Sequence, residues 1–410
     1  MVESPVSRPR QAAILFILIT VMLDVLSFGI IIPVLPRLVE EFLAGDTAQA
    51  AQIYGLMGMA WALMQFVCSP IQGALSDRFG RRPVVLLSNL GLGLDYIFMA
   101  LAPDVTWLFV GRVISGIASS SFSTAGAYIA DVTPPEKRAA GFGMIGAAFG
   151  LGFVLGPAVG GMLGTIDPRL PFWGAAATSL VNACYGFFVL PESLPREKRM
   201  AFSWKRANPI GSLVLLRSHP ELFSLATVAF LGYLAHAVLP STAVLYVGYR
   251  YGWGPSAVGF MLAGAGISAM LVQGVLMRPI TARLGERRTL LTGLLCGAIG
   301  FSLYGLAPTA WLYCAGIPVM AFWGLAGPAT QSLMTRRVSA SEQGQLQGAI
   351  AGLSGIAGLI GPGLFTQTFA FFIRSDAVLS ASVPLPGAPF LLAALLLLLA
   401  MTLAWRATAR

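Results

Sequence analysis

Residues 73–83 read GALSDRFGRRP and lie between two long apolar runs of the chain. The same alternation, an apolar run followed by a short polar break, continues along the whole sequence. Each run has about the 20 residues that an α-helix needs to cross the hydrocarbon core of a bilayer. The pattern predicts an all-α membrane protein with twelve transmembrane helices, at about 11–35, 51–74, 84–102, 106–130, 140–164, 171–190, 221–248, 255–277, 289–307, 310–334, 344–372 and 387–405.

The composition agrees with a membrane protein. Charged residues make up 10% of the 410 residues and hydrophobic residues 56%, whereas an ordinary soluble domain has about 25% charged residues. Twelve spans leave no room for a separate soluble catalytic domain. The sequence has two His residues and shows no nucleophile–base or metal cluster, and its four Cys residues fall inside apolar runs. We therefore expect neither an enzyme nor a protein with a metal or other cofactor.

The net charge of +9 reflects membrane orientation rather than nucleic-acid binding. Loops that stay inside the cell are rich in Lys and Arg. With the N-terminus inside, every Lys and Arg falls in an inner segment except five, namely Arg37, Arg169, Arg250 and Arg374 in outer segments and Arg112 within a span. Both termini are therefore expected in the cytoplasm.

The two halves of the chain repeat each other. A shift by half of the 410 residues aligns features in three separate places. These are Leu101-Ala102-Pro103 with Leu306-Ala307-Pro308, Gly156-Pro157 with Gly361-Pro362, and Arg78 and Gly80 with Arg283 and Gly285. The repeat predicts two six-helix halves with pseudo-two-fold symmetry, 1–190 and 221–410, as in alternating-access transporters. The polar residues 191–220 between them are interpreted as a cytoplasmic central loop, a solvated tether.

Three ionisable residues, Asp24, Asp95 and Arg112, lie well inside predicted spans. An ion in lipid costs several kcal/mol, so each must face a cavity or a partner. A carboxyl group held between desolvation and a nearby Arg is able to bind and release a proton, which a proton-coupled carrier needs. A purely structural Arg–Asp pair between helices 3 and 4 is the alternative. The matching residues of the second half, Ala229, Gly300 and Ile317, carry no charge.

Neutral polar and aromatic residues in the spans are the candidates for a substrate cavity. They are Gln65, Asn182, His236, Gln273, Trp323 and Gln331. For each of them, a hydrogen bond or packing contact between helices is an equally good explanation. Glycines four residues apart, such as Gly156 and Gly160 beside Pro157, predict close helix packing. A functional interpretation is that the two halves slide along this contact during transport.

At loop 73–83 the sequence resembles a known family. GALSDRFGRRP is similar to the loop 2–3 signature of the major facilitator superfamily. GRVISG at 111–116 resembles a helix 4 signature of proton-coupled members, and GLGFVLGPAVGG at 150–161 resembles the helix 5 signature of the drug/proton antiporter branch. Nearly the whole chain resembles tetracycline/proton antiporters of that branch.

The resemblance implies a bacterial inner-membrane exchanger in which Asp24, Asp95 and Arg112 couple the proton to the substrate. It also implies that Asp77, Arg78 and Asp131 form an inner-face charge network that latches the outward-open state. The residues expected to act in gating are Gly73, Asp77, Arg78, Gly80, Arg81, Arg82, Asp131, Gly156, Pro157 and Gly160. Arg81 and Arg82 are also explained as orientation charges alone.

The second half departs from the antiporter pattern. The helix 8 His of the family falls on Ala269 and the helix 9 carboxylate on Gly297, whereas the polar Gln273 is retained. A metal–tetracycline chelate therefore meets fewer polar groups here than in the family.

The expected function is proton-driven export of a small organic compound by a monomer in the lipid bilayer with no cofactor. Tetracycline, free or as its metal chelate, is the candidate substrate. One alternative is a symporter or facilitator that imports a sugar or an organic acid. The other is a receptor that has kept the fold and lost transport.

Overall fold

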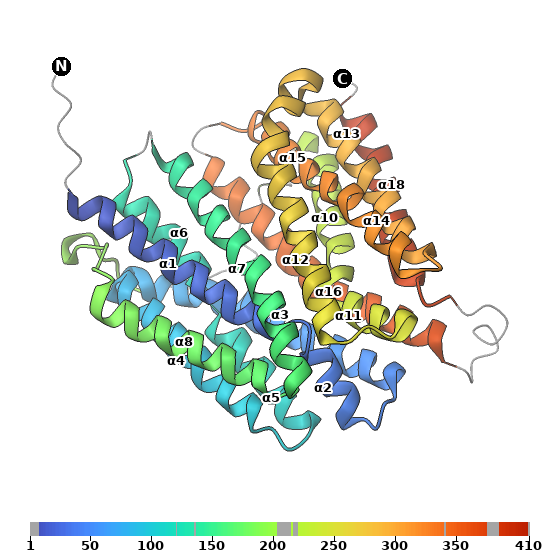
Figure 1. Ribbon diagram of the computed structural model, residues 1–410. Coiled ribbons are helices and arrows are strands. Elements are labelled where there is room, and N and C mark those ends of the chain that lie inside the picture. The colour runs from blue at the N-terminus through green and yellow to red at the C-terminus, as the bar shows by residue number, and fades with distance from the viewer. Residues whose placement is uncertain are drawn as a thin grey trace. The chain divides into compact units, whose positions relative to one another are not determined.

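The computed structural model describes residues 8–119, 121–134, 137–202, 215, 220–339, 342–374 and 385–408. Across these ranges the chain forms helices and no β-strand (Figure 1). The helices are α1 (Arg8–Ile31), α2 (Leu35–Phe42), α3 (Thr47–Phe79), α4 (Arg81–Ala100), α5 (Val105–Ala118), α6 (Ser121–Val132), α7 (Arg138–Ile166), α8 (Leu170–Val189), η2 (Arg196–Lys198), α10 (Pro220–His236), α11 (Val238–Tyr251), α12 (Pro255–Leu271), η4 (Val272–Leu276), α13 (Met277–Leu306), α14 (Ala310–Ala321), η5 (Phe322–Leu325), α15 (Ala326–Thr335), α16 (Gln343–Ile373) and α18 (Ala388–Ala407).

The helices account for the twelve predicted spans. Ten helical segments of the described chain are long and apolar enough to cross a membrane. One of them, Pro255–Leu306, has 52 residues, and a single helix of that length would be more than twice as long as the ~30 Å hydrocarbon core. Gly285 breaks it with non-helical dihedral angles (φ 73°, ψ 164°), so it contains two spans. Helix 4 is the twelfth span and is built from α5 and α6.

The internal repeat is visible in the backbone. Gly80 and Gly285, half a chain apart, both have positive φ, 108° and 73°, a conformation that glycine adopts without strain. A Cβ on Gly111 would meet the side chain of Met99, and a Cβ on the matching Gly316 would meet the ring of Tyr304, which matches Met99. Three pairs of helices also begin half a chain apart, at Val105 and Ala310, at Arg138 and Gln343, and at the glycine breaks. The predicted repeat is confirmed.

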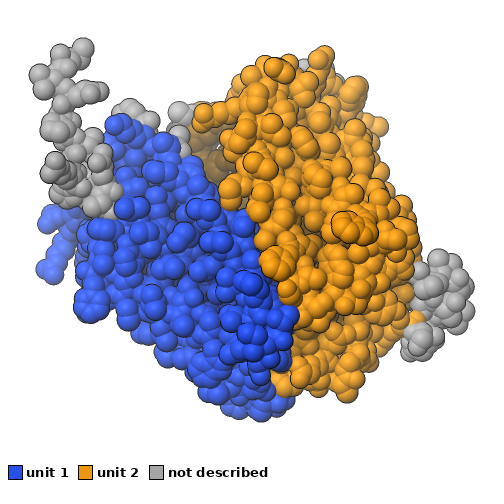
Figure 2. All heavy atoms as spheres, in the orientation of Figure 1, with its two compact units in different colours: residues 1–34, 64–208 blue, residues 35–63, 209–410 orange. Residues whose placement is uncertain are grey.

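The chain divides into two compact units (Figure 2). Unit 1 comprises residues 1–34 and 64–208, and unit 2 comprises residues 35–63 and 209–410. The helix α3 contributes to both. The halves 1–190 and 221–410 follow the internal repeat of the sequence. That they are the domains of the protein stays a prediction.

In unit 2, the first half of α3 packs on α16. The hydroxyl of Tyr54 donates a 3.1 Å hydrogen bond to the carbonyl of Pro240. A Cβ on Gly55 would overlap Thr366, and a Cβ on Gly58 would lie 3.0 Å from the ring of Pro362. These contacts explain why residues 35–63 group with the C-terminal part of the chain.

In unit 1, α1 and α7 run side by side (Figure 1). A Cβ on Gly156 would lie 2.8 Å from the carbonyl oxygen of Leu26, and a Cβ on Gly160 would overlap the carbonyl of Ile30. The predicted close packing is therefore a contact within one unit. A role of Gly156, Pro157 and Gly160 in conformational change stays a prediction.

We expect Gly160→Ala to lower the free energy of unfolding by about 1–3 kcal/mol, because the added methyl group forces α1 and α7 apart. Gly146→Ala on the same helix is the matched control, since its Cβ meets nothing within 4 Å. Unfolding in mixed micelles titrated with sodium dodecyl sulfate measures both. Equal stability of the two variants would contradict the close contact.

Candidate proton-coupling site and charge network

Asp95 is buried between α4 and α5. It is 2% exposed, and the hydroxyl of Ser115 donates a hydrogen bond to its Oδ2. A Cβ on Gly111 would lie 3.3 Å from Oδ1 of Asp95. Gly111 and Ser115 are one helical turn apart, so the 111–116 motif places a gap and a donor on the face of α5 that covers this carboxyl group.

Arg112 and Asp24 lie in the same buried region of unit 1. Each is 7% exposed, and the guanidinium of Arg112 exerts an electrostatic attraction on Asp95. The phenol of Tyr96, which is 2% exposed, experiences the charges of Asp24, Asp95 and Arg112 together. The structure therefore groups the three residues singled out from the sequence. Tyr96 was not among the predicted site residues, although its position directly after Asp95 was a signal.

Asn182 connects α8 to α1 near Asp24. Its Nδ2 donates a 2.9 Å hydrogen bond to the carbonyl of Thr20, one helical turn before Asp24. Thr20 is 1% exposed and Asn182 is fully buried. Asn182 was a cavity candidate, and in the structure its hydrogen bond to α1 lies one helical turn from Asp24.

Arg81 is the centre of a second charge group, where α3 meets α4. Its Nη1 lies 2.6 Å from Oδ1 of Asp77, and its Nε lies 3.1 Å from Oδ2 of Asp131. Nη1 also donates a 2.9 Å hydrogen bond to Ser76. Arg81 is 9% exposed, so this guanidinium is a buried bridge between two carboxylates. Explaining it as an orientation charge alone was incomplete.

Arg78 and Arg82 have other contacts. Arg78 is exposed, and its guanidinium lies 5.0 Å above the ring of Phe79. Arg82 donates a hydrogen bond to the carbonyl of Phe187 at the end of α8 and lies over its ring. Among the ion pairs that the structure describes, Arg81 holds the place between Asp77 and Asp131 that the resemblance assigned to Arg78.

The start of the central loop, residues 191–202, packs on unit 1. Glu192 accepts a 2.8 Å hydrogen bond from the backbone N–H of Arg81. The N–H of Met200 donates to the carbonyl of Asp77 at 3.1 Å. This part of the solvated loop is therefore also bonded to unit 1, because its polar groups complete the network around α3 and α4. Three charged residues of the loop lie outside the described residues, namely Lys205, Arg206 and Arg217.

Gly80 is required at this junction for two reasons. Its φ is 108°, and a Cβ there would overlap the carboxylate of Glu192. Gly73, in contrast, has space for a side chain, because a Cβ there would meet nothing within 4 Å. In unit 2 the matching junction pairs Glu286 with Arg336 at 2.8 Å. The repeat thus preserves an acid–base contact at both glycine breaks.

In unit 2, three of the cavity candidates lie on neighbouring segments, with η4 packed against η5. The rings of His236 and Trp323 are 5.7 Å apart. A Cβ on Gly324 would lie 3.0 Å from Nε2 of Gln273. Gln273 lies in the π-helical segment η4 and Trp323 in the 3₁₀ segment η5. π-helical turns are frequent at functional sites, and a 3₁₀ stretch within a helix often marks a hinge.

Trp323 also accounts for the missing helix 9 carboxylate. A Cβ on Gly297 would lie 2.8 Å from the indole of Trp323 and 2.6 Å from Leu397. An acidic side chain at this position has no room while the indole is in place. Ala269 is half-buried on α12. The structure thus replaces a charged group with an aromatic surface.

The two remaining candidates are less informative. Gln331 donates a 3.0 Å hydrogen bond to Gln347 between α15 and α16, which fits the interhelical explanation. Gln65 is half-buried on α3 in unit 1.

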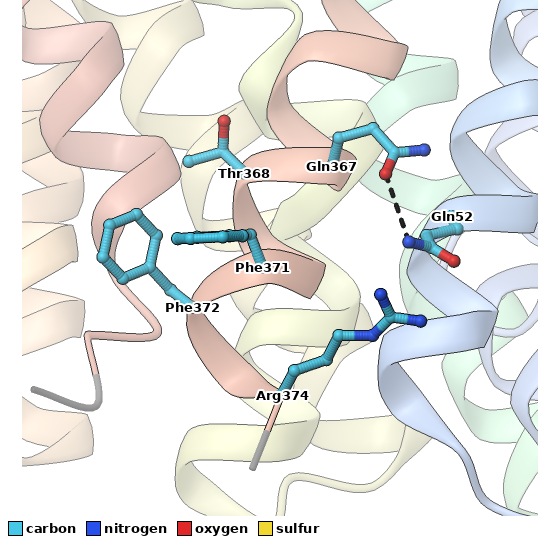
Figure 3. Close-up of a pocket in the computed structure, with 6 residues that line it drawn as sticks. All are labelled: Gln52, Gln367, Thr368, Phe371, Phe372 and Arg374. Atoms are coloured by element: carbon cyan, nitrogen blue, oxygen red, sulfur yellow. Dashed lines mark hydrogen bonds between the residues drawn. The ribbon is translucent and has the colours of Figure 1, made fainter. Parts of the chain in front are cut away.

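A cavity of about 410 Å³ lies at the C-terminal end of α16 (Figure 3). Gln52 and Gln367 close one side through a 3.2 Å hydrogen bond. Phe371 and the guanidinium of Arg374 line the rest, together with Thr368 and Phe372. No sequence motif pointed to this amphipathic cleft. The described residues contain no group of three His, Cys, Asp or Glu that is able to hold a metal ion.

An internally repeated bundle of twelve spans with charges buried among its helices is the construction of a secondary transporter. The family model of the Major Facilitator Superfamily matches residues 17–362. The chain belongs to this superfamily and is a multi-pass membrane transporter of the drug/proton antiporter kind, with a small molecule as substrate.

Known relatives agree. The tetracycline resistance protein of class C from Escherichia coli is 38% identical over 358 residues, which cover 87% of this chain and 90% of the relative. The class D protein of Salmonella ordonez is 36% identical over 367 residues, 88% of this chain and 90% of the relative. A crystal structure of a bacterial homologue of the human lysosomal transporter Spinster, inward-facing and unoccupied, has a TM-score of 0.75 at 19% identity over 98% of both chains, which shows the same fold.

We expect Arg81→Gln to lower the free energy of unfolding by about 3 kcal/mol, because it leaves Asp77 and Asp131 without their shared cation. Arg78→Gln is the matched control and changes the stability by less than about 0.5 kcal/mol, as for an exposed residue. Thermal unfolding of both purified variants in detergent measures the difference. A larger loss of stability in the Arg78 variant would contradict the assignment of the network to Arg81.

Proposed function

We propose that the chain exports a polycyclic, tetracycline-like compound in exchange for protons, and that Asp24, Asp95 and Arg112 carry the coupling. The observation behind this proposal is the burial of these three charges in one unit, around Tyr96. Two carboxylates and one guanidinium leave a formal charge of −1, which a single proton neutralises. Taking up that proton lowers the cost of burial, so protonation and the conformation of the site are linked.

The orientation follows from the charges around Arg81. We infer that this end of unit 1 faces the cytoplasm, because it carries the Lys and Arg residues of loop 2–3 and of the central loop. Both termini then lie on the same side. Relatives from bacteria that are named for tetracycline resistance support the inner membrane as the location.

The substrate site of unit 2 is aromatic. Trp323 and His236 offer ring surfaces and Gln273 offers hydrogen bonds, a combination that suits a planar polycyclic ligand with polar edges. The names of the relatives support tetracycline as the first compound to test. Since Trp323 fills the space beside Gly297, we infer that recognition depends on the ring system more than on a chelated metal.

Transport rather than catalysis is the function that these features support. Binding and release of a proton at Asp24 and Asp95 needs only the proton gradient, so we propose no cofactor. The coupling group is built from the helices of one unit, and we therefore propose that a monomer is the working form.

Asp24→Asn is expected to abolish proton-driven export while the protein still inserts and folds, because the amide keeps the shape of the side chain and loses its proton chemistry. Glu197→Gln, in the short helix η2, is the control and keeps wild-type export. Proteoliposomes with an internal pH-sensitive dye and an imposed pH gradient report the proton flux on addition of tetracycline. Normal export by the Asp24 variant would remove this residue from the mechanism.

Trp323→Ala should weaken tetracycline binding about tenfold, equivalent to about 1.4 kcal/mol, because the ligand loses its aromatic platform. Trp311→Ala serves as the control, since Trp311 is 86% exposed. Quenching of tetracycline fluorescence gives both affinities, with and without a chelator of divalent cations. Strong loss of wild-type binding in the chelator would show that a metal, and not the indole, governs recognition.

A further inference from the structure

The cavity at the C-terminal end of α16 has a polar side and an aromatic side. Figure 3 shows the amides of Gln52 and Gln367 and the guanidinium of Arg374 on one side, and the rings of Phe371 and Phe372 on the other. All the residues that line it belong to unit 2. The proposed export function uses none of them, so the cleft has a chemistry that this function does not explain.

One face of α16 supplies most of the lining. Gln367, Phe371 and Arg374 follow one another at intervals of one helical turn, which places them on the same side of the helix. Phe371 is 47% exposed, so its ring is accessible to a ligand. Arg374 caps α16, and its backbone N–H donates a 3.2 Å hydrogen bond to the carbonyl of Ala370. The end of the helix therefore fixes the point from which the guanidinium reaches the cleft.

The facing wall comes from α3, which is held close to α16. Gln52 donates a 3.2 Å hydrogen bond to Gln367, and further along the same two helices Gly55 meets Thr366. A primary amide has two N–H donors and an acceptor oxygen, so the bonded pair still offers donors and an acceptor to a ligand. The polar side of the cleft is therefore formed before a ligand binds.

The internal repeat does not require such a cleft. Half a chain before Gln367 and Phe371, at the end of α7, stand Met162 and Ile166. These apolar side chains are 47% and 76% exposed, as expected of side chains in contact with lipid. Arg169, the match of the cleft arginine, donates a 3.0 Å hydrogen bond to a backbone carbonyl at the end of α4. The amide and the ring of the cleft are therefore particular to unit 2.

The cleft suits an organic anion with a flat ring. A guanidinium has five N–H donors in a fork that matches a carboxylate, and none of the described residues that line the cleft is acidic. The face of Phe371 offers a stacking surface for an aromatic ring.

The size of the cleft limits the ligand. Its volume of about 410 Å³ lies within the range of about 300–1,000 Å³ for small-molecule sites. Since a water-sized group occupies about 30 Å³, the cleft has room for roughly 14 such groups. This number suits a molecule of one or two rings better than a lipid with two acyl chains.

We propose that this cleft is a binding site for a small aromatic carboxylate, with the carboxylate on Arg374, the ring on Phe371 and the polar edge on the two glutamine amides. None of these residues belongs to the coupling group or to the aromatic group of Trp323. Gln52 lies near the start of α3, at the opposite end of this helix from Asp77. With the proposed orientation, the ligand therefore enters from the outer side of the membrane.

The test uses the purified full-length protein and tritiated 2-naphthoate in a scintillation proximity assay. Arg374→Gln removes the cation, and Phe371→Leu removes the ring while keeping an apolar side chain. Arg250→Gln is the matched control, because Arg250 is an exposed arginine of the same unit that does not line the cleft. Thermal unfolding of each purified variant verifies that it is folded.

We expect about tenfold weaker binding of 2-naphthoate to the Arg374 variant, because the carboxylate loses its charge-assisted hydrogen bonds. The Phe371 variant should bind about fivefold more weakly, and the Arg250 variant should have wild-type affinity. Unlabelled 2-naphthamide, which has the same ring without the charge, should compete about tenfold less well than 2-naphthoate. No binding to the wild type, or equal affinity of the wild type and the folded Arg374 variant, would overturn the proposal.

Native mass spectrometry with phosphatidylglycerol separates this ligand from a lipid phosphate, which a guanidinium also binds. Loss of bound phosphatidylglycerol in the Arg374 variant, with no binding of 2-naphthoate to the wild type, would assign the cleft to a lipid headgroup and overturn the proposal. Equal lipid binding by both proteins, with 2-naphthoate binding weakened in the variant, supports it. None of these readouts involves export, so this result is independent of the proposed exchange of tetracycline for protons.

Discussion

The cost of placing charge in lipid is the constraint on which this structure depends. A charged side chain or an unpaired backbone group in the bilayer has no water to bind. The chain meets this constraint by confining its intramembrane charge to one unit, where Ser115 and Arg112 surround Asp95. Elsewhere in the spans, hydroxyl groups such as those of Thr20 and Ser27 bond to carbonyls of their own helix. A buried polar side chain that is not bonded to its own helix in this way is therefore a candidate for a functional role.

Close helix contacts make this confinement possible. Gly111 lets α5 approach α4 until its backbone covers Asp95, and Gly93 lets α8 approach α4 at Leu180. A Cβ on Gly152 of α7 would lie 2.8 Å from the carbonyl oxygen of Met22, two residues before Asp24. In a bilayer, such contacts supply the association energy that the hydrophobic effect supplies in water. The glycines around the carboxylates therefore position the charged group as well as the helices.

The number of helices and the repeat could be predicted from the sequence, because bilayer thickness sets the length of each apolar run and a backbone with positive φ requires glycine. The ion-pair partner of Asp77 could not be predicted. Loop 73–83 reads as a turn, whereas α3 continues to Phe79 and places Arg81, rather than Arg78, on the face of Asp77 and Asp131. Contacts between distant helices, such as that of Trp323 with Gly297, leave no periodic signal. Tyr96 belongs to this second class, since its surroundings depend on which helix packs against it.

The repeat also explains why the two units differ in chemistry. Gly300 of α13 stands where Asp95 stands in α4, and a Cβ there would lie 3.0 Å from the backbone of Met320. A carboxylate cannot fit while α13 and α14 are this close. The neighbouring space is filled by rings instead, with Tyr304 stacked on Tyr313 at 4.3 Å. Matching positions of the repeat thus hold either a charged group or an aromatic one, depending on how closely two helices approach. The proposed proton coupling in unit 1 and the proposed ring recognition in unit 2 both fit this difference.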